Sequence, residues 1–203
     1  MLPLSQIRRF AQTVDAAGCS PAADRVAAAW GYPPGAARHC RTSANHVFTI
    51  GGTAYLRFLP AAYRDRDRVS RVAGLMRRLH DEGLPVAEPV PSTNGDLVET
   101  VSTDNGPVHA MLVQTAPGEQ LDVDSLTPQR ARAWGAALAR LHRDCQYHDG
   151  LPDWFEDLAF DGDPALSTAI GALAGALSTL PRTRLGYGFC HGDFELDNMA
   201  WRG

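Results

Sequence analysis

Two apolar-rich runs separated by a pair of glycines are the feature that most restricts the fold of this chain. In the segment HVFTIGGTAYLRF, residues 46–50 and 54–58 flank Gly51 and Gly52. Adjacent glycines supply the positive φ angles that tight hairpin turns require. The pattern therefore predicts an antiparallel hairpin. In its second strand Leu56 and Phe58 share one face, and Arg57 lies on the other.

Helical and strand patterns alternate around this hairpin. The first forty residues are predicted to be helical, with Ser20 and Pro21 as N-cap and first helical position of one helix. A second amphipathic helix ends at Gly83, with Pro85 just beyond. Two further strands are expected near residues 96–101 and 109–114. The apolar stripe predicted to pack the second helix on the sheet consists of Val69, Val72, Met76 and Leu79.

The second half of the chain has a different pattern. Residues 115–122 contain Pro and Gly together, which is typical of a connector. Helices are expected after Thr127 and over residues 163–180, and a short apolar strand leads into residue 190. The stripe expected on the first of these helices is Ala131, Trp134, Leu138 and Leu141. The sequence therefore predicts an α+β fold, with a β-rich domain over 1–114 and a mostly helical domain over 115–203.

Charge and composition exclude several classes of protein. The formal net charge of −4 disfavours a nucleic-acid-binding role, because such surfaces need clustered basic residues. One local cluster of arginines is interleaved with acids, so we interpret it as a solvated helix face. The four cysteines have no paired spacing, and neither a signal sequence nor an apolar span is present, which predicts a cytoplasmic protein without a membrane segment. The clustered arginines are Arg64, Arg66, Arg68, Arg71, Arg77 and Arg78.

The strongest chemical motif is CHGDFELDN at residues 190–198. An Asp followed by an Asn five residues later can supply two parts of a phosphoryl-transfer site. Asp193 would accept the proton of an acceptor hydroxyl, Asn198 would hold a metal through its amide oxygen, and Gly192 would allow a sharp turn. The alternative is a structural turn in which Asp193 caps a helix and His191 is a core histidine.

A second segment, HRDCQYH at residues 142–148, imitates functional motifs. His142, Arg143 and Asp144 spell the catalytic triplet of protein kinases, but they end a predicted helix and Asp149, not Asn, follows five residues after Asp144. We interpret them as basic residues near helix carbonyls. A zinc site through His142, Cys145 and His148 is a weaker alternative, since no fourth ligand is near.

In order along the chain, several segments resemble the aminoglycoside phosphotransferase / choline kinase family, a phosphotransferase enzyme family with a protein-kinase-like two-lobed fold. The resemblance spans roughly residues 42–198, and the shared order is more specific than any single motif. It implies a β-rich N-lobe and a mostly helical C-lobe. The segments that carry it are TSANHVFTIGGTAYLRF, RVAGLMRRLHDEGLPVAEPV, HAMLVQTAPGEQLD, AWGAALARLHR and HGDFELDN.

The resemblance implies roles for individual residues. Asp193 would be the catalytic base, Asn198 a Mg²⁺ ligand, and His191 would orient the loop. Arg57 would contact the phosphates of ATP or GTP, with Ser43 and Asn45 lying over them. Gln114, Thr115 and Ala116 would form a hinge whose backbone groups bind the purine.

Two departures from the family follow from the same resemblance. The N-lobe helix usually offers a Glu to the phosphate-binding cation, and here Val72 stands at that position. The family also continues into an Asp-containing motif that supplies the main Mg²⁺ ligand, whereas this chain ends at Gly203, so we expect an incomplete C-lobe and little activity of this chain. The acceptor, an aminoglycoside-, choline- or homoserine-like hydroxyl compound, and the oligomeric state stay open. A nucleotide-binding pseudokinase or partner-binding module is the alternative function.

Overall fold

The computed structural model describes residues 2, 4–145, 163–183, 186–188 and 190–202. The chain divides into two compact units. The first comprises Met1–Glu119 together with Trp201–Gly203, and the second comprises Gln120–Ala200. The units are described separately below, and the domain boundary predicted after Gln114 stays a prediction.

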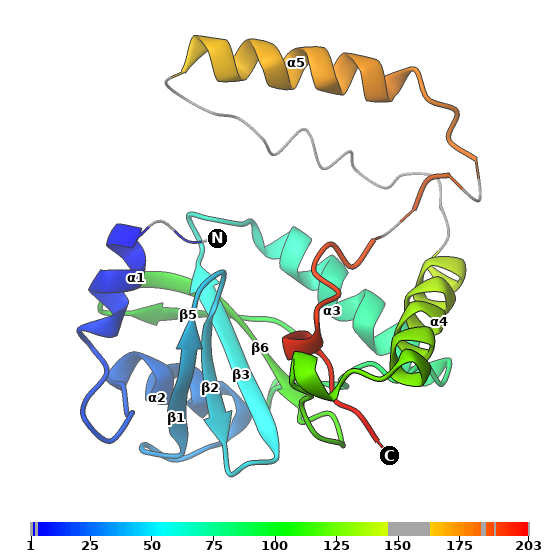
Figure 1. Ribbon diagram of the computed structural model, residues 1–203. Helices are drawn as coiled ribbons and strands as arrows, with labels where there is room; N and C mark the ends of the chain where they lie inside the picture. Colours follow the sequence, from blue (N-terminus) through cyan, green and yellow to red (C-terminus); the bar gives the residue numbers. More distant parts are fainter. Residues whose placement is uncertain (1, 3, 146–162, 184–185, 189, 203) are drawn as a thin grey trace. The chain divides into compact units, whose positions relative to one another are not determined.

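The first unit is built on a mixed-length antiparallel sheet of six strands (Figure 1). Its order is β1-β2-β3-β6-β4, and β5 also pairs with β6. The predicted hairpin is present: Phe48 of β2 pairs with Leu56 of β3, and Gly51 and Gly52 have φ angles of +58° and +70°. The strands are β1 (Ala37–Thr42), β2 (His46–Ile50), β3 (Ala54–Pro60), β4 (Pro89–Val90), β5 (Glu99–Thr103) and β6 (Gly106–Gln114).

Strand β1 corrects the expectation that the first forty residues are helical. Its sequence, ARHCRT, has no regular apolar alternation, so the pattern did not identify it. The strand exists because its backbone groups pair with β2, a tertiary contact that overrides the weak local preference. The two-residue β4 is likewise set by its pairing with β6.

One face of the sheet is covered by α1 (Leu4–Ala11) and α2 (Pro21–Ala27), which is followed by the short helix η1 (Ala28–Trp30). Ser20 precedes α2 as predicted, with Pro21 at the first turn, but its side chain contacts Thr13 and forms no capping bond. The packed side chains include Phe10 and Val26 from the helices and Phe48 and Phe58 from the sheet. This face therefore holds the larger apolar core.

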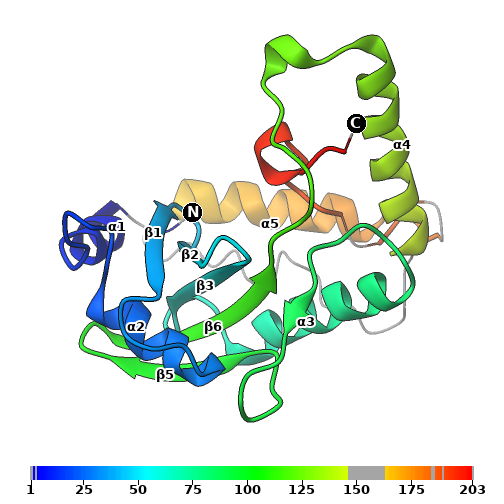
Figure 2. The ribbon, with the colours of Figure 1, turned by 90° about the horizontal axis from the view of Figure 1, so that it is seen from below.

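The opposite face is covered by α3 (Arg66–Asp81), which contacts β4 and β6 (Figure 2). Asp65 caps the helix by accepting a hydrogen bond from the Arg68 N–H at 2.7 Å. Val69 and Leu79 are buried as predicted. The prediction that Val72 packs on the sheet is wrong, because its side chain is 42% exposed. Ala73 is fully buried instead of Val72. It follows Val69 by four residues, so it lies on the same face of the helix as Val69, toward the sheet.

The second unit contains η2 (Val123–Ser125), α4 (Pro128–Asp144), α5 (Pro164–Ser178) and η4 (Leu196–Asn198). Thr127 caps α4 and Asp163 caps α5, each by accepting a backbone N–H. Along α4, Trp134, Leu138 and Leu141 are partly buried, whereas Ala131 is exposed. The strand expected before residue 190 lies partly outside the described residues. None of the described helices has both the length and the apolar character needed to span a membrane.

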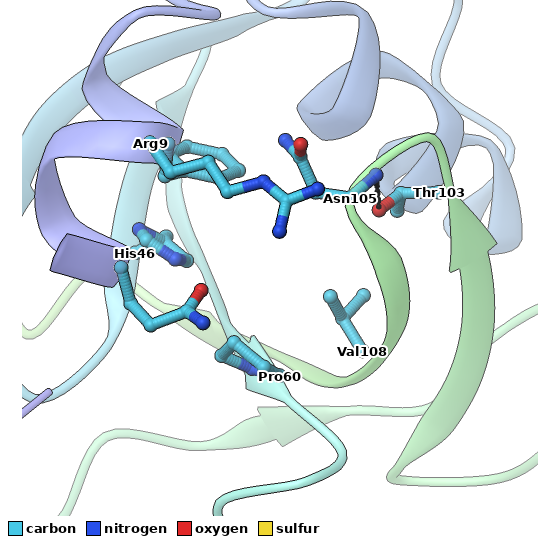
Figure 3. A pocket seen from close by; sticks show the side chains of 8 residues that line it. Arg9, His46, Pro60, Thr103, Asn105 and Val108 are labelled. Atoms are coloured by element: carbon cyan, nitrogen blue, oxygen red, sulfur yellow. Dashed lines mark hydrogen bonds between the residues drawn. The ribbon is translucent and has the colours of Figure 1, made fainter. Parts of the chain in front are cut away.

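A small hollow lies on the α1 side of the sheet (Figure 3). His46 lies beside it, only 2% exposed, with its ring stacked on Phe10 at 3.6 Å and its Nδ1 3.3 Å from Thr42 Oγ1. Burial, and secondarily the nearby His39, lowers the pKa of His46 from 6.5 to about 4. His46 is therefore a neutral core residue at physiological pH. The lining residues are Gln6, Arg9, Phe10, His46, Pro60, Thr103, Asn105 and Val108.

The buried His46 predicts a specific pH dependence of stability. The unfolded chain protonates this histidine at pH 6.5, whereas the folded chain does so only near pH 4. The unfolded state therefore binds more protons in this window, so the free energy of unfolding falls by about 3 kcal/mol as pH drops from 6.5 to 4. Urea unfolding at several pH values, compared between wild type and His46→Phe, measures this. Parallel curves for the two proteins would show that His46 is not the group responsible.

Candidate functional site

The predicted catalytic residues lie together on one exposed loop of the second unit. Asn198, the last residue of η4, donates from Nδ2 to Asp193 Oδ2 at 3.0 Å and to the Asp193 carbonyl at 3.1 Å. Gly192 has a φ angle of +74°, which is the left-handed conformation that glycine adopts most easily. The loop therefore brings Asp193 and Asn198 into direct contact.

The orientation of the Asn198 amide follows from this contact. A carboxylate can only accept hydrogen bonds, so the amide nitrogen must face Asp193 and the carbonyl Oδ1 must be turned away from it. The Asn198 amide oxygen, a ligand type that Mg²⁺ accepts, therefore points away from the Asp193 carboxylate.

The loop is attached to α4. Trp134 Nε1 donates to the carbonyl of Phe194 at 3.1 Å, and the ring of Phe194 meets that of His191 edge-on at 5.3 Å. His191 is exposed, so the alternative in which it is a core histidine is not what this loop shows. Trp134, which the sequence identified only as part of an apolar stripe, contacts the backbone next to Asp193. Only its position on α4 was visible from the sequence.

Arg57 lies in the first unit, on the α3 face of the sheet. It is paired across the strands with Val47 of β2 and Met111 of β6. Burial is the main cause that lowers its pKa, and the charges of Arg41 and Arg64 lower it further. Among the described residues no carboxylate forms an ion pair with Arg57. A partly buried guanidinium next to like charges is an arrangement that an anion would stabilise.

Ser43 and Asn45 form the short loop between β1 and β2. The Ser43 N–H donates to the Asn45 carbonyl at 3.1 Å, and the Ser43 carbonyl accepts from Leu2 at 3.0 Å. The loop follows Arg41 in β1 and precedes Val47, the cross-strand neighbour of Arg57. Ser43 and Asn45 thus lie in the β1–β2 hairpin, and β2 of this hairpin is the strand next to Arg57 in the sheet.

The predicted hinge, Gln114 to Ala116, follows β6. The Gln114 N–H donates to the Glu88 carbonyl at 2.8 Å and the Thr115 N–H to the Thr53 carbonyl at 2.9 Å, so these two donors are already used. In the part of the chain that the structure describes, nothing accepts from the Ala116 N–H. Glu88, which the sequence did not identify, also accepts from the Gln114 side chain at 3.0 Å and from Arg77 at 3.0 Å.

Immediately beyond the hinge, Glu119 pairs with Trp201. The two residues exchange backbone hydrogen bonds of 2.9 Å and 2.8 Å. Gly118 has a φ angle of +130°, and a Cβ there would lie 2.7 Å from the Trp201 carbonyl carbon. The residues that precede and follow the second unit, Glu119 and Trp201, are therefore hydrogen-bonded to each other. No local pattern in the sequence indicated this pairing.

The segment that imitates functional motifs has a structural explanation. His142 and Arg143 lie in the last turn of α4, as interpreted from the sequence. His148, one ligand of the alternative zinc site, lies outside the described residues, so that alternative is not tested. Elsewhere in the described ranges, no three His, Cys, Asp or Glu side chains are grouped so as to hold a metal.

Comparison with known proteins decides the family. The family model described as the phosphotransferase enzyme family matches residues 42–203. The chain belongs to the phosphotransferase enzyme family. The match covers the β1–β2 loop, Arg57, the hinge and the loop with Asp193 and Asn198, which confirms the resemblance inferred from the motifs. A comparison with curated proteins gives no match.

Solved structures of similar fold are kinases. An amicoumacin kinase in complex with AMP-PNP, Ca²⁺ and Ami has a TM-score of 0.65 at 21% identity, covering 82% of this chain and 55% of its own. A microcompartment-associated aminopropanol kinase has a TM-score of 0.62 at 20% identity, covering 88% of this chain and 63% of its own. An aminoglycoside-3'-phosphotransferase of type VIII has a TM-score of 0.40 at 20% identity, covering 88% and 71%.

The likenesses to the amicoumacin kinase and the aminopropanol kinase establish the fold of this chain. The α+β, protein-kinase-like fold with a β-rich N-lobe and a partial helical lobe is confirmed. The chain spans less than two thirds of the amicoumacin kinase and aminopropanol kinase chains.

Proposed function

We propose that the protein transfers the γ-phosphate of ATP or GTP to a hydroxyl group of a small molecule. The observation that carries the proposal is the contact between Asn198 and Asp193, by which an amide and a carboxylate meet on one exposed loop. Membership of the phosphotransferase enzyme family supports the reaction class. The amicoumacin kinase complex contains a triphosphate analogue and a divalent cation, which supports a nucleotide and a metal as partners.

Each residue has a defined task in this proposal. Asp193 accepts the proton of the acceptor hydroxyl, and His191 orients the loop through its contact with Phe194. Arg57 binds the phosphates, with Ser43 and Asn45 above them. The hinge binds the purine edge through the Ala116 N–H and through carbonyls of Gln114 and Thr115.

The donor set fits Mg²⁺ in kind. Asn198 Oδ1 is a hard donor, and Mg²⁺ commonly takes one or two protein ligands together with phosphates and water. Bound there, the ion would offset negative charge on the phosphates.

The test of the proposal is phosphoryl transfer itself. ADP or GDP release is measured with amino alcohols, aminoglycosides, choline, homoserine and sugars as acceptors. Acceptor-dependent release supports the proposal. Nucleotide binding without release for any acceptor would favour the alternative of a non-catalytic nucleotide-binding protein.

Replacement of Arg57 is expected to lower the affinity for the nucleotide. In Arg57→Ala, Mg²⁺·ATP binding should weaken by about 1.5–3 kcal/mol, because a charge-assisted contact to phosphate is removed. The free energy of unfolding without ligand should be unchanged or higher, since the replacement removes repulsion with Arg41 and Arg64. Calorimetric titration and thermal unfolding measure the two effects.

A matched control separates this effect from a general loss of positive charge. Arg78 lies on α3 and pairs with Glu82 at 3.6 Å, so Arg78→Ala removes the same charge elsewhere. Equal ATP affinities of wild type and Arg57→Ala would remove Arg57 from the site.

A further inference from the structure

Glu88 contacts three elements of the first unit at the point where β6 ends. Its backbone carbonyl accepts from the Gln114 N–H at 2.8 Å, directly before the two-residue strand β4, in which Pro89 pairs with Val113. On the other side of β6, Gln114 pairs with Ala54 of β3. Gln114, the first residue of the predicted hinge, therefore has backbone neighbours on both sides.

The Glu88 side chain makes a second connection to the same hinge residue. Its Oε2 accepts from Gln114 Nε2 at 3.0 Å, and its Oε1 accepts from Arg77 Nη1 of α3 at 3.0 Å. Arg77 also donates to the carbonyl of Pro89, and His80 Nε2, about one turn further along α3, lies 3.7 Å from Glu88 Oε2. The carboxylate is therefore held from α3 while it binds the side chain of Gln114.

Partial burial strengthens this connection. The side chains of Arg77 and Glu88 are 29% and 27% exposed, whereas those of the Arg78–Glu82 pair on the same helix are 41% and 48% exposed. Solvent and salt screen a partly buried pair less than an exposed one. Hydrogen bonds to a charged group are also stronger than those between neutral groups. The Gln114 amide is therefore bound to an acceptor whose own position is fixed.

The position of Gln114 matters for the proposed purine site. Backbone groups bind a ligand best when they are already in place, because ordering them on binding costs affinity. The N–H groups of Gln114 and Thr115 are used within the first unit, so the place of the remaining hinge groups depends on how the end of β6 is held. We propose that Glu88 is a positioning residue for the purine and acts through Gln114. This proposal rests on the function proposed above, and the family resemblance assigned no role to Glu88.

Removal of either side chain of the contact tests the proposal in the full chain. Adenosine and inorganic tripolyphosphate are titrated separately in EDTA, so that purine binding and phosphate binding are measured apart. Glu88→Ala and Gln114→Ala should each weaken adenosine binding by about five- to ten-fold, since a hydrogen bond to a charged group is lost. Tripolyphosphate binding should be unchanged in Gln114→Ala, which alters no charge. Glu82→Ala, which removes the same charge from the pair with Arg78, should bind adenosine like wild type.

An exchange of the two side chains separates positioning from a general loss of structure. Gln114→Glu places two carboxylates against each other and should weaken adenosine binding at least as much as Gln114→Ala. Adding Glu88→Gln restores an amide–carboxylate pair, and the oxygen of the new amide can still accept from Arg77. The double variant Glu88→Gln/Gln114→Glu should therefore recover most of the adenosine affinity. Thermal unfolding measured in parallel shows that each variant is folded.

The outcomes distinguish this proposal from the function on which it rests. Adenosine affinity that is unchanged in Glu88→Ala and Gln114→Ala would overturn the proposal and leave the proposed function in place. Equal losses of adenosine and tripolyphosphate affinity in Gln114→Ala, or no recovery in the double variant, would also overturn it, because both indicate a general structural role. If wild type binds neither adenosine nor tripolyphosphate nor ATP, the proposed function fails and the positioning role fails with it.

Discussion

Replacement of Asp193 by Asn is expected to lower the rate of phosphoryl transfer by about 10²–10⁴-fold and to leave nucleotide affinity nearly unchanged. The amide cannot accept a proton from the acceptor hydroxyl, so base catalysis is lost. The loop should keep its shape, because the side-chain oxygen of Asn can still accept the hydrogen bond from Asn198 Nδ2. Because little activity is expected of this chain alone, ADP release is measured in a version that also carries the Asp-containing motif of the family, and ATP titration measures the nucleotide affinity.

A nearby acid provides the control for this substitution. Glu195 is exposed on the same loop, and Glu195→Gln changes the charge by the same amount without removing the proposed base. Its transfer rate should stay within a few-fold of wild type. Undiminished turnover in Asp193→Asn would mean that the HGD segment is only a turn.

Local patterns were sufficient for the elements whose stability is mainly local. Gly51 and Gly52 determine the β2–β3 turn, and Gly83, a glycine with a positive φ angle, ends α3 as predicted. The closeness of Asp193 and Asn198 could also be inferred from the sequence, because the two are five residues apart and a single loop brings them together.

Features that depend on partners far apart in the sequence were not predictable in the same way. Strand β1 has no clear alternation and is defined by β2, and the register shift between His39 and Arg41 leaves no signal in the composition. The Val72 error has a related cause. Helical spacing allows either i+3 or i+4 after Val69, and only packing on the sheet selects Ala73.

Gly118 is the second position at which a single substitution should have a large effect. In Gly118→Ala the new Cβ would lie 2.7 Å and 2.9 Å from the carbonyl carbon and nitrogen of Trp201, so that backbone must move. The substitution combines backbone strain with the loss of both Glu119–Trp201 hydrogen bonds, on the order of 2–6 kcal/mol together. Hydrogen exchange at the Glu119 and Trp201 amides should accelerate accordingly, and thermal unfolding reports any global effect.

Gly95 separates the two contributions. It also has a positive φ angle, +89°, but a Cβ there would meet nothing within 4 Å. Gly95→Ala should therefore show only the cost of the left-handed backbone, about 1–2 kcal/mol, without faster exchange at Glu119 or Trp201. If Gly118→Ala behaves like Gly95→Ala, the close approach of Trp201 does not restrict this position. If it behaves as expected, the Pro-Gly turn requires glycine because a distant segment of the chain packs directly against its backbone.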